Sequence, residues 1–142
     1  MDTLFEGDFV GELIPQKFPF VMVDKLYSYT ETSIISGLKI KPGNIFNNNG
    51  LFTEAGLIEH MAQTIALHTG YSFYLKNEPA PTGYIGSIKE IEITGLPKLG
   101  DEIQTTVSVL QEFAGVTLVD ISTKINNIEI ASGQMKTVLA KT

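Results

Sequence analysis

The stretch that decides the fold runs from residue 53 to residue 75 and reads TEAGLIEHMAQTIALHTGYSFYL. It contains no proline, so no residue in it has to end a helix. Thr53 is a favourable N-cap, and Glu54 suits the positive end of a helix dipole. The sequence therefore predicts one long helix, from about Thr53 to Leu75.

Before this helix, the chain divides into a short helix and a pair of strands. Residues 5–13 predict an amphipathic helix, and Pro15 ends it because proline lacks a donor and restricts the residue before it. β-branched and aromatic residues at 18–30 and 32–41 predict two strands. Turn residues at 30–31 separate them, so we expect a hairpin.

After the long helix, the loop NEPAPTG contains two prolines that forbid further helix. Four strand-like runs follow, at 82–94, 101–113, 115–125 and 128–140. The last two junctions have the composition of tight turns, so we expect an antiparallel meander. One long helix and six strands predict an α+β fold, a single domain over residues 1–142 in which a six-stranded antiparallel sheet wraps around the central helix.

Composition restricts the possible partners. The 142 residues carry a formal net charge of -6, and the lysines are scattered singly, whereas nucleic acid requires a basic stripe. No apolar run reaches the roughly 20 residues that span a bilayer, and the N-terminus is acidic, so we expect a cytoplasmic protein without a membrane span. There is no cysteine, and the two histidines lack a third ligand at a metal spacing. We therefore expect no metal and no cofactor.

Glu59 stands among apolar residues of the predicted helix. At about 100° per residue it lies within roughly 60° of the centre of an apolar stripe. The stripe consists of Ala55, Ile58, Ala62, Ile65 and Ala66. Gln63, one turn later, can hydrogen-bond the carboxylate. Glu59 is thus either a solvated or lysine-paired glutamate at the edge of the stripe, or a general acid or base tuned by partial burial. His60 and His68 face elsewhere and are interpreted as surface or packing groups.

Three motifs, in order along the chain, resemble those of a known family. The first is IPQKFPFVMVDKL at 14–26, the second is LIEHMAQTIALHTGY at 57–71, and the third is YIGSIKEIEITGLPKLGDEI at 84–103. They are similar to the motifs of the hotdog-fold beta-hydroxyacyl-acyl carrier protein dehydratases. The resemblance implies a hotdog fold, a dimer, and an acyl thioester substrate on acyl carrier protein or coenzyme A.

The resemblance also implies a catalytic dyad that is shared across the dimer. In the family, a loop histidine of one subunit and a helix carboxylate of the other remove an alpha proton and help the hydroxyl leave as water. Glu59 corresponds to the carboxylate, but Ile45 stands where the histidine should be. The implied catalytic residue is therefore Glu59 alone. The implied substrate-binding residues are Gln63, Gly56, Phe46, Asn47, Asn48 and Gln16.

An asparagine-containing loop without histidine, followed by E-x-M-A-Q-T, resembles the branch of this family linked to aryl polyene and related pigment lipid biosynthesis. Three functions remain open: a dehydratase that uses Glu59 with an unconventional partner, a non-catalytic subunit that pairs with a histidine-bearing relative and can donate Glu59 to it, and an acyl thioesterase. A homodimer and a heterodimer are both possible. Because carrier proteins are acidic, the candidate docking residues are Lys17, Lys25, Lys89 and Lys98.

Overall fold

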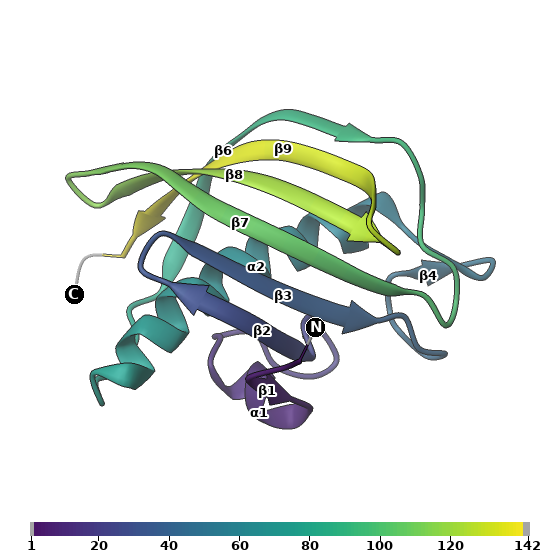
Figure 1. The fold of residues 1–142 in the computed structure, drawn as a ribbon, viewed down its shortest axis with the longest axis horizontal. Coiled ribbons are helices and arrows are strands. Elements are labelled where there is room, and N and C mark those ends of the chain that lie inside the picture. Colours follow the sequence, from purple (N-terminus) through teal and green to yellow (C-terminus); the bar gives the residue numbers. More distant parts are fainter. Residues whose placement is uncertain (1, 141–142) are drawn as a thin grey trace.

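The long predicted helix is present in the computed structural model, which describes residues 2–140 (Figure 1). Helix α2 spans Glu54–Leu75, and the hydroxyl of Thr53 caps it by accepting a hydrogen bond from the Gly56 N–H at 3.3 Å. Both ends of the predicted helix are therefore confirmed. The remaining three residues of the expected domain, Met1 and 141–142, lie outside the described residues.

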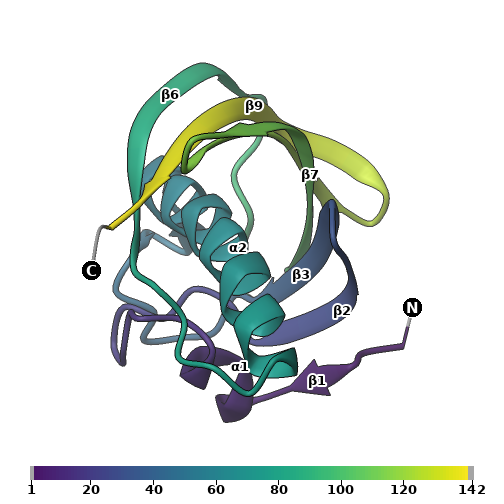
Figure 2. The ribbon, with the colours of Figure 1, turned by 90° about the vertical axis from the view of Figure 1, so that its left-hand side faces the viewer.

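An antiparallel sheet wraps around α2, as Figure 2 shows along the helix. Its strands are β1 (Phe5–Glu6), β2 (Lys25–Thr30), β3 (Ser33–Lys39), β6 (Gly83–Ile93), β7 (Glu102–Phe113), β8 (Val116–Ile125) and β9 (Ile128–Leu139). Their order across the sheet is β1-β2-β3-β7-β8-β9-β6. Just before α2, a separate pair joins β4 (Asn47–Asn48) to β5 (Leu51–Phe52). The predicted arrangement of an antiparallel sheet around one central helix is confirmed.

The number and order of the strands differ from the prediction. The sheet has seven strands because Phe5 and Glu6 pair with β2, which leaves only Asp8–Glu12 for the short helix α1. The meander contains three strands, β7, β8 and β9, because β6 lies beyond β9 and β7 pairs with β3. The connection between β6 and β7 is not a tight turn, so it allows the chain to cross from the edge of the sheet to its central strand.

The sheet covers a face of α2 different from the predicted apolar stripe. Six side chains of the helix are fully buried: Leu57, His60, Met61, Gln63, Thr64 and Leu67. In the predicted stripe, Ala55 is exposed and only Ile65 is buried. Hydrophobic periodicity fails here because the sheet supplies hydrogen-bond partners that allow polar side chains to face it. The stripe instead marks the side of α2 that the sheet leaves partly open.

The segment before β2 is also not the strand that its composition predicts. β2 begins at Lys25, whereas the sequence predicted a strand from residue 18. The carbonyl of Phe20 and both backbone polar groups of Met22 bond side chains of α2 and not a neighbouring strand. Within residues 2–140, no helix has the length and apolar character needed to cross a membrane.

Candidate functional site

Gln63 holds the carboxylate of Glu59 in a defined position. The Gln63 Nε2 group donates to Glu59 Oε2 at 2.8 Å and to the carbonyl oxygen of Phe20 at 2.7 Å. Its Oε1 accepts from the backbone N–H of Met22 at 2.6 Å. Both amide hydrogens and the amide oxygen are thus engaged, so the amide cannot turn without breaking a buried hydrogen bond. The predicted contact between Gln63 and Glu59 is present.

Glu59 lies on the partly open side of α2, beside a segment with exposed aromatic residues. The Glu59 side chain is half-buried, whereas Gln63 is fully buried. The carbonyl of Phe20 accepts a hydrogen bond from the same Gln63 amide group that bonds Glu59. Phe20 is 55% exposed, and Phe18 is 93% exposed. An apolar surface without cover is typical of a binding face. Phe20 and Met22 are site residues that composition did not reveal, because it assigned them to a strand.

Neither histidine of the chain can act as a base at Glu59. His60 is fully buried, with Nδ1 2.6 Å from the carbonyl oxygen of Met22 and Nε2 2.8 Å from Thr105 Oγ1. Burial lowers its pKa to about 4. His68 Nε2 lies 2.9 Å from the carbonyl oxygen of Thr30, nine residues or roughly 13 Å along the helix from Glu59. The interpretation of His60 as a packing group is confirmed.

Two of the substrate-binding candidates, Phe46 and Gly56, meet at the N-terminus of α2. A Cβ at Gly56 would lie 2.6 Å from Phe52 Cζ and 2.8 Å from Phe46 Cβ, so these two side chains leave room only for glycine. The N–H of Gly56 is taken by the Thr53 hydroxyl. Asn47 Nδ2 donates to the carbonyl oxygen of Lys41 at 2.9 Å. Phe46 and Gly56 are therefore in contact with each other, and their contacts belong to the helix cap.

The other two candidates are held in different ways. Asn48 is exposed and pairs with Leu51 in the small sheet. Gln16 is partly buried, and its Oε1 has no hydrogen-bond partner among the described residues, as is also the case for Asn47 Oδ1. Of the six substrate-binding candidates, Gln63 is the one that the described hydrogen bonds join to Glu59.

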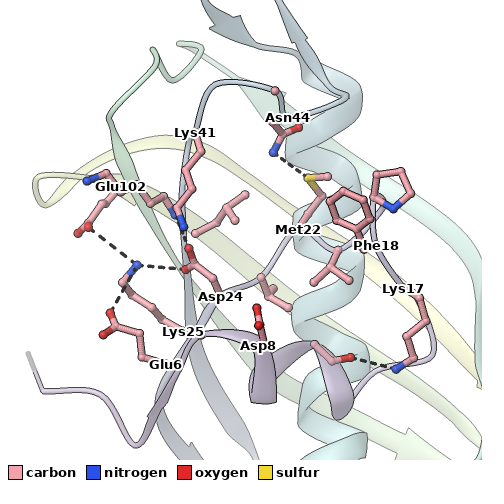
Figure 3. A pocket seen from close by; sticks show the side chains of 18 of the residues that line it. Glu6, Asp8, Lys17, Phe18, Met22, Asp24, Lys25, Lys41, Asn44 and Glu102 are labelled. Atoms are coloured by element: carbon pink, nitrogen blue, oxygen red, sulfur yellow. Dashed lines mark hydrogen bonds and ion pairs between the residues drawn. The ribbon is translucent and has the colours of Figure 1, made fainter.

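A cavity of about 1120 Å³ lies between α1 and the segments 17–25 and 38–44 (Figure 3). The side chain of Met22 lines it and bonds Asn44 through sulfur, while the backbone of Met22 bonds α2. Neither Glu59 nor Gln63 lines this cavity. It is therefore separate from the carboxylate that the family resemblance singles out.

Two of the four lysines expected to dock a carrier protein are engaged within the chain. Lys25 is buried and lies 3.1 Å from Asp24, 3.8 Å from Glu6 and 3.9 Å from Glu102 (Figure 3). Burial opposes its charge, but Asp24 and Glu102 outweigh burial and raise the Lys25 pKa.

Lys25 therefore joins β1, β2 and β7 within the chain. This role corrects the prediction that Lys25 docks a carrier protein. Lys17 donates to the carbonyl oxygens of Gly11 and Ile14 at the end of α1. Lys89 and Lys98 remain as exposed candidates. In the described part of the chain, no group of three histidine or acidic side chains could hold a metal ion.

Comparison with known proteins places this geometry in a family. The model of the ApeP-like family, described as ApeP dehydratase, matches residues 9–141. The chain is 26% identical over 133 residues to the 3-hydroxyacyl-[acyl-carrier-protein] dehydratase FabZ of Vibrio cholerae, which covers 89% of this chain and 86% of that protein.

Two solved structures share the fold at low sequence identity. One is the dehydratase heterocomplex ApeI:P from Xenorhabdus doucetiae, with a TM-score of 0.87 and 14% identity over 94% of this chain and 91% of that chain. The other is the PaaI protein of the Escherichia coli phenylacetic acid degradation operon, with a TM-score of 0.65 and 14% identity over 80% of each chain. The predicted hotdog fold is confirmed.

Proposed function

The chain belongs to the ApeP-like dehydratase family, and we propose that it contributes Glu59 to a site that dehydrates a 3-hydroxyacyl thioester. A second hotdog subunit, which carries a histidine, completes this site. One observation carries the proposal. Gln63 holds Glu59 at 2.8 Å on the partly open side of α2, while both histidines of the chain are bonded elsewhere. The FabZ relative supports an acyl carrier protein as the thioester carrier, with coenzyme A as the alternative.

The proposed reaction needs one acid and one base. The imidazole of the partner removes the alpha proton of the hydroxyacyl chain, and protonated Glu59 gives its proton to the beta hydroxyl, which leaves as water. The products are the enoyl thioester, a charged imidazole and an ionised Glu59, and transfer of one proton between the two groups restores the site. Because Gln63 bonds Oε2, Glu59 Oε1 is the oxygen that remains for the substrate.

A second copy of the same chain would not supply the base. In a symmetric homodimer, the loop from residue 44 to residue 52, NIFNNNGLF, would face both sites, and it contains no side chain that titrates near neutral pH. A heterodimer with a histidine-bearing relative supplies what is missing. The solved ApeI:P heterocomplex, which shares this fold, supports that assembly.

The free edge of β6 is the surface that we propose for the partner. β6 has 11 residues, forms one edge of the sheet and pairs only with β9. Its side chains Tyr84 and Ile88 are 62% and 47% exposed. A long edge strand with exposed apolar side chains and unpaired backbone groups favours pairing with another chain. Helix α2 contacts β6, so a partner on this edge also approaches the helix that carries Glu59.

Coexpression with a histidine-bearing hotdog dehydratase tests the proposal. We expect the copurified complex to convert a 3-hydroxyacyl carrier-protein thioester to the enoyl product, and the chain alone to form none. Glu59→Gln should lower kcat of the complex by about a hundredfold or more without preventing assembly. Glu54→Gln, an exposed glutamate in the first turn of the same helix, serves as the control and should retain activity.

Three results would overturn the proposal. Full activity of the isolated chain would show that no partner base is needed. Unchanged kcat in the Glu59→Gln complex would remove Glu59 from the reaction. Release of free thiol from the thioester without an enoyl product would favour the thioesterase.

A further inference from the structure

A continuous row of buried hydrogen bonds joins the sheet to Glu59. Thr123 Oγ1 lies 2.6 Å from Thr105 Oγ1, which lies 2.8 Å from His60 Nε2. His60 Nδ1 lies 2.6 Å from the carbonyl oxygen of Met22. The N–H of Met22 bonds Gln63, which in turn bonds Glu59. The row therefore runs from β8 and β7 through α2 and the segment 20–22 to the carboxylate.

Chemistry fixes the direction of every bond in this row. The carbonyl oxygen of Met22 can only accept, so the hydrogen of the His60 ring is on Nδ1. His60 is neutral near neutral pH because burial lowers its pKa to about 4. Its Nε2 therefore accepts from the Thr105 hydroxyl, and Thr105 accepts from Thr123. At the other end, the N–H of Met22 can only donate, which assigns the oxygen of the Gln63 amide to Met22.

Met22 is consequently held at both of its backbone polar groups by one helix. His60 holds its carbonyl, and Gln63, three residues later on α2, holds its N–H. Residues 20–22 are outside the sheet, so strand pairing does not fix their position. Without the His60 ring, the Met22 carbonyl would be left buried and unpaired, and the segment would have to move to find another donor.

We propose that His60 is a positioning residue for Glu59, because it fixes Met22, which orients the Gln63 amide that holds the carboxylate. Its effect on catalysis rests on the proposed function, but its effect on geometry does not. The structure offers a matched comparison for a purely structural role. Ser36 Oγ lies 2.7 Å from Thr64 Oγ1 between the sheet and the same helix, and both residues are fully buried. That bond does not contact Met22.

Hydrogen exchange of the Gln63 side-chain amide, measured by NMR on the isolated chain, tests the proposal. In the native protein, we expect two separate, protected amide resonances. His60→Leu should raise their exchange rate about tenfold above that of Ser36→Ala, because only the first change frees Met22. His60→Asn, whose amide can still donate to Met22, should restore most of the protection.

The comparison is made at conditions where the variants have equal free energies of unfolding, so that global opening contributes equally to exchange. Equal exchange rates in His60→Leu and Ser36→Ala would overturn the proposal. If His60→Leu does not fold, Thr105→Val replaces it, because it removes the second partner of the ring. It should raise the rate about threefold above Ser36→Ala, and an equal rate would overturn the proposal.

A second measurement separates this inference from the proposed function. In the complex with the histidine-bearing subunit, His60→Asn should retain more of kcat than His60→Leu, with KM unchanged in both. Altered amide exchange in an inactive complex would leave the positioning role of His60 intact and contradict the proposed function. An active complex in which His60→Leu alters neither kcat nor the exchange rate would contradict the positioning role alone.

Discussion

At His60, a polar side chain is fully buried on the side of α2 that the sheet covers. The sequence predicted that His60 faces a different side of the helix from Glu59, and that geometry is correct, but the sheet covers the side that contains His60. Thr105 and the Met22 carbonyl make this burial possible, since they satisfy both ring nitrogens. The partners come from sequence positions 38 and 45 residues away, and no local pattern reveals them.

The burial of His60 predicts a specific acid sensitivity. The ordinary pKa of 6.5 applies in the unfolded chain, while the folded value is about 4. Below about pH 6.5 the unfolded state binds a proton that the folded state does not. The free energy of unfolding therefore decreases as the pH is lowered from about 6.5 to about 4. Between about pH 7.5 and pH 4.5, the native protein should lose about 2–3 kcal/mol more than His60→Asn, as measured by urea unfolding.

His68→Asn is the control for this linkage. It should keep the acid sensitivity of the native protein, because the buried imidazole of His60 is retained. Asp24 opposes the lowering of the His60 pKa, and it is present in all these proteins together with the other carboxylates, so their contribution largely cancels in the difference. An equal loss of stability in the native protein and in His60→Asn would contradict the prediction.

Among the elements, the N-terminal segment depends most on tertiary contacts. The sequence predicted one helix over residues 5–13, but Phe5 joins the sheet and α1 begins only at Asp8. Aromatic rings hold the segment on the C-terminal half of α2. The ring centroids of Phe5 and Tyr71 are 5.8 Å apart, and those of Phe9 and Tyr74 are 5.4 Å apart. Packing against α2 outweighs the local preference for a longer helix.

Close contact between these elements makes Gly70 sensitive to substitution. A Cβ at this position would overlap the carbonyl oxygen of Leu13, directly after α1. Alanine is the better helix former by about 1 kcal/mol, yet Gly70→Ala should lower the free energy of unfolding by about 1–3 kcal/mol, because backbone has to move. Urea unfolding measures the change.

Gly95→Ala provides the comparison, since its Cβ would have its nearest neighbour at an ordinary 3.8 Å. That substitution should alter the free energy of unfolding by no more than about 0.5 kcal/mol. A Gly70→Ala protein as stable as the native one would mean that the contact between Leu13 and α2 is adaptable.

For the whole molecule, the uncovered apolar surface predicts an assembly. β6 exposes Ile88 at a free edge, whereas β7, which exposes Leu110 to a similar extent, is an inner strand of the sheet, although its pairing with β3 ends at Ser108. Ile88→Lys should weaken binding of the histidine-bearing subunit by about tenfold or more, because charge on an edge strand opposes pairing. Sedimentation of the mixed subunits measures the dissociation constant.

Leu110→Lys is the matched change away from the edge. It adds the same charge to a comparably exposed side chain and should leave the dissociation constant within about twofold. If both variants bind equally well, the partner does not use β6. If Leu110→Lys is the weaker binder, the interface lies on the outer face of the sheet.

The sequence by itself determined the elements whose cause is local. The bounds of α2 follow from Thr53 as its cap, and the contact between Gln63 and Glu59 follows from their spacing of one turn. The hotdog fold and the family followed from three motifs in order. The sequence also shows directly that the loop at 44–52 contains no histidine.

Only the tertiary structure decided which side of α2 faces the sheet, where β6 pairs, and what holds residues 20–22. Each of these depends on partners far apart in sequence, such as Met22 with Gln63 and β6 with β9. A polar side chain is tolerated in the core only where a hydrogen-bond partner reaches it. The order of the strands follows the path of the connecting loops, and local composition does not encode that path. For this reason the sequence located the carboxylate, and the fold revealed the bonds that orient it.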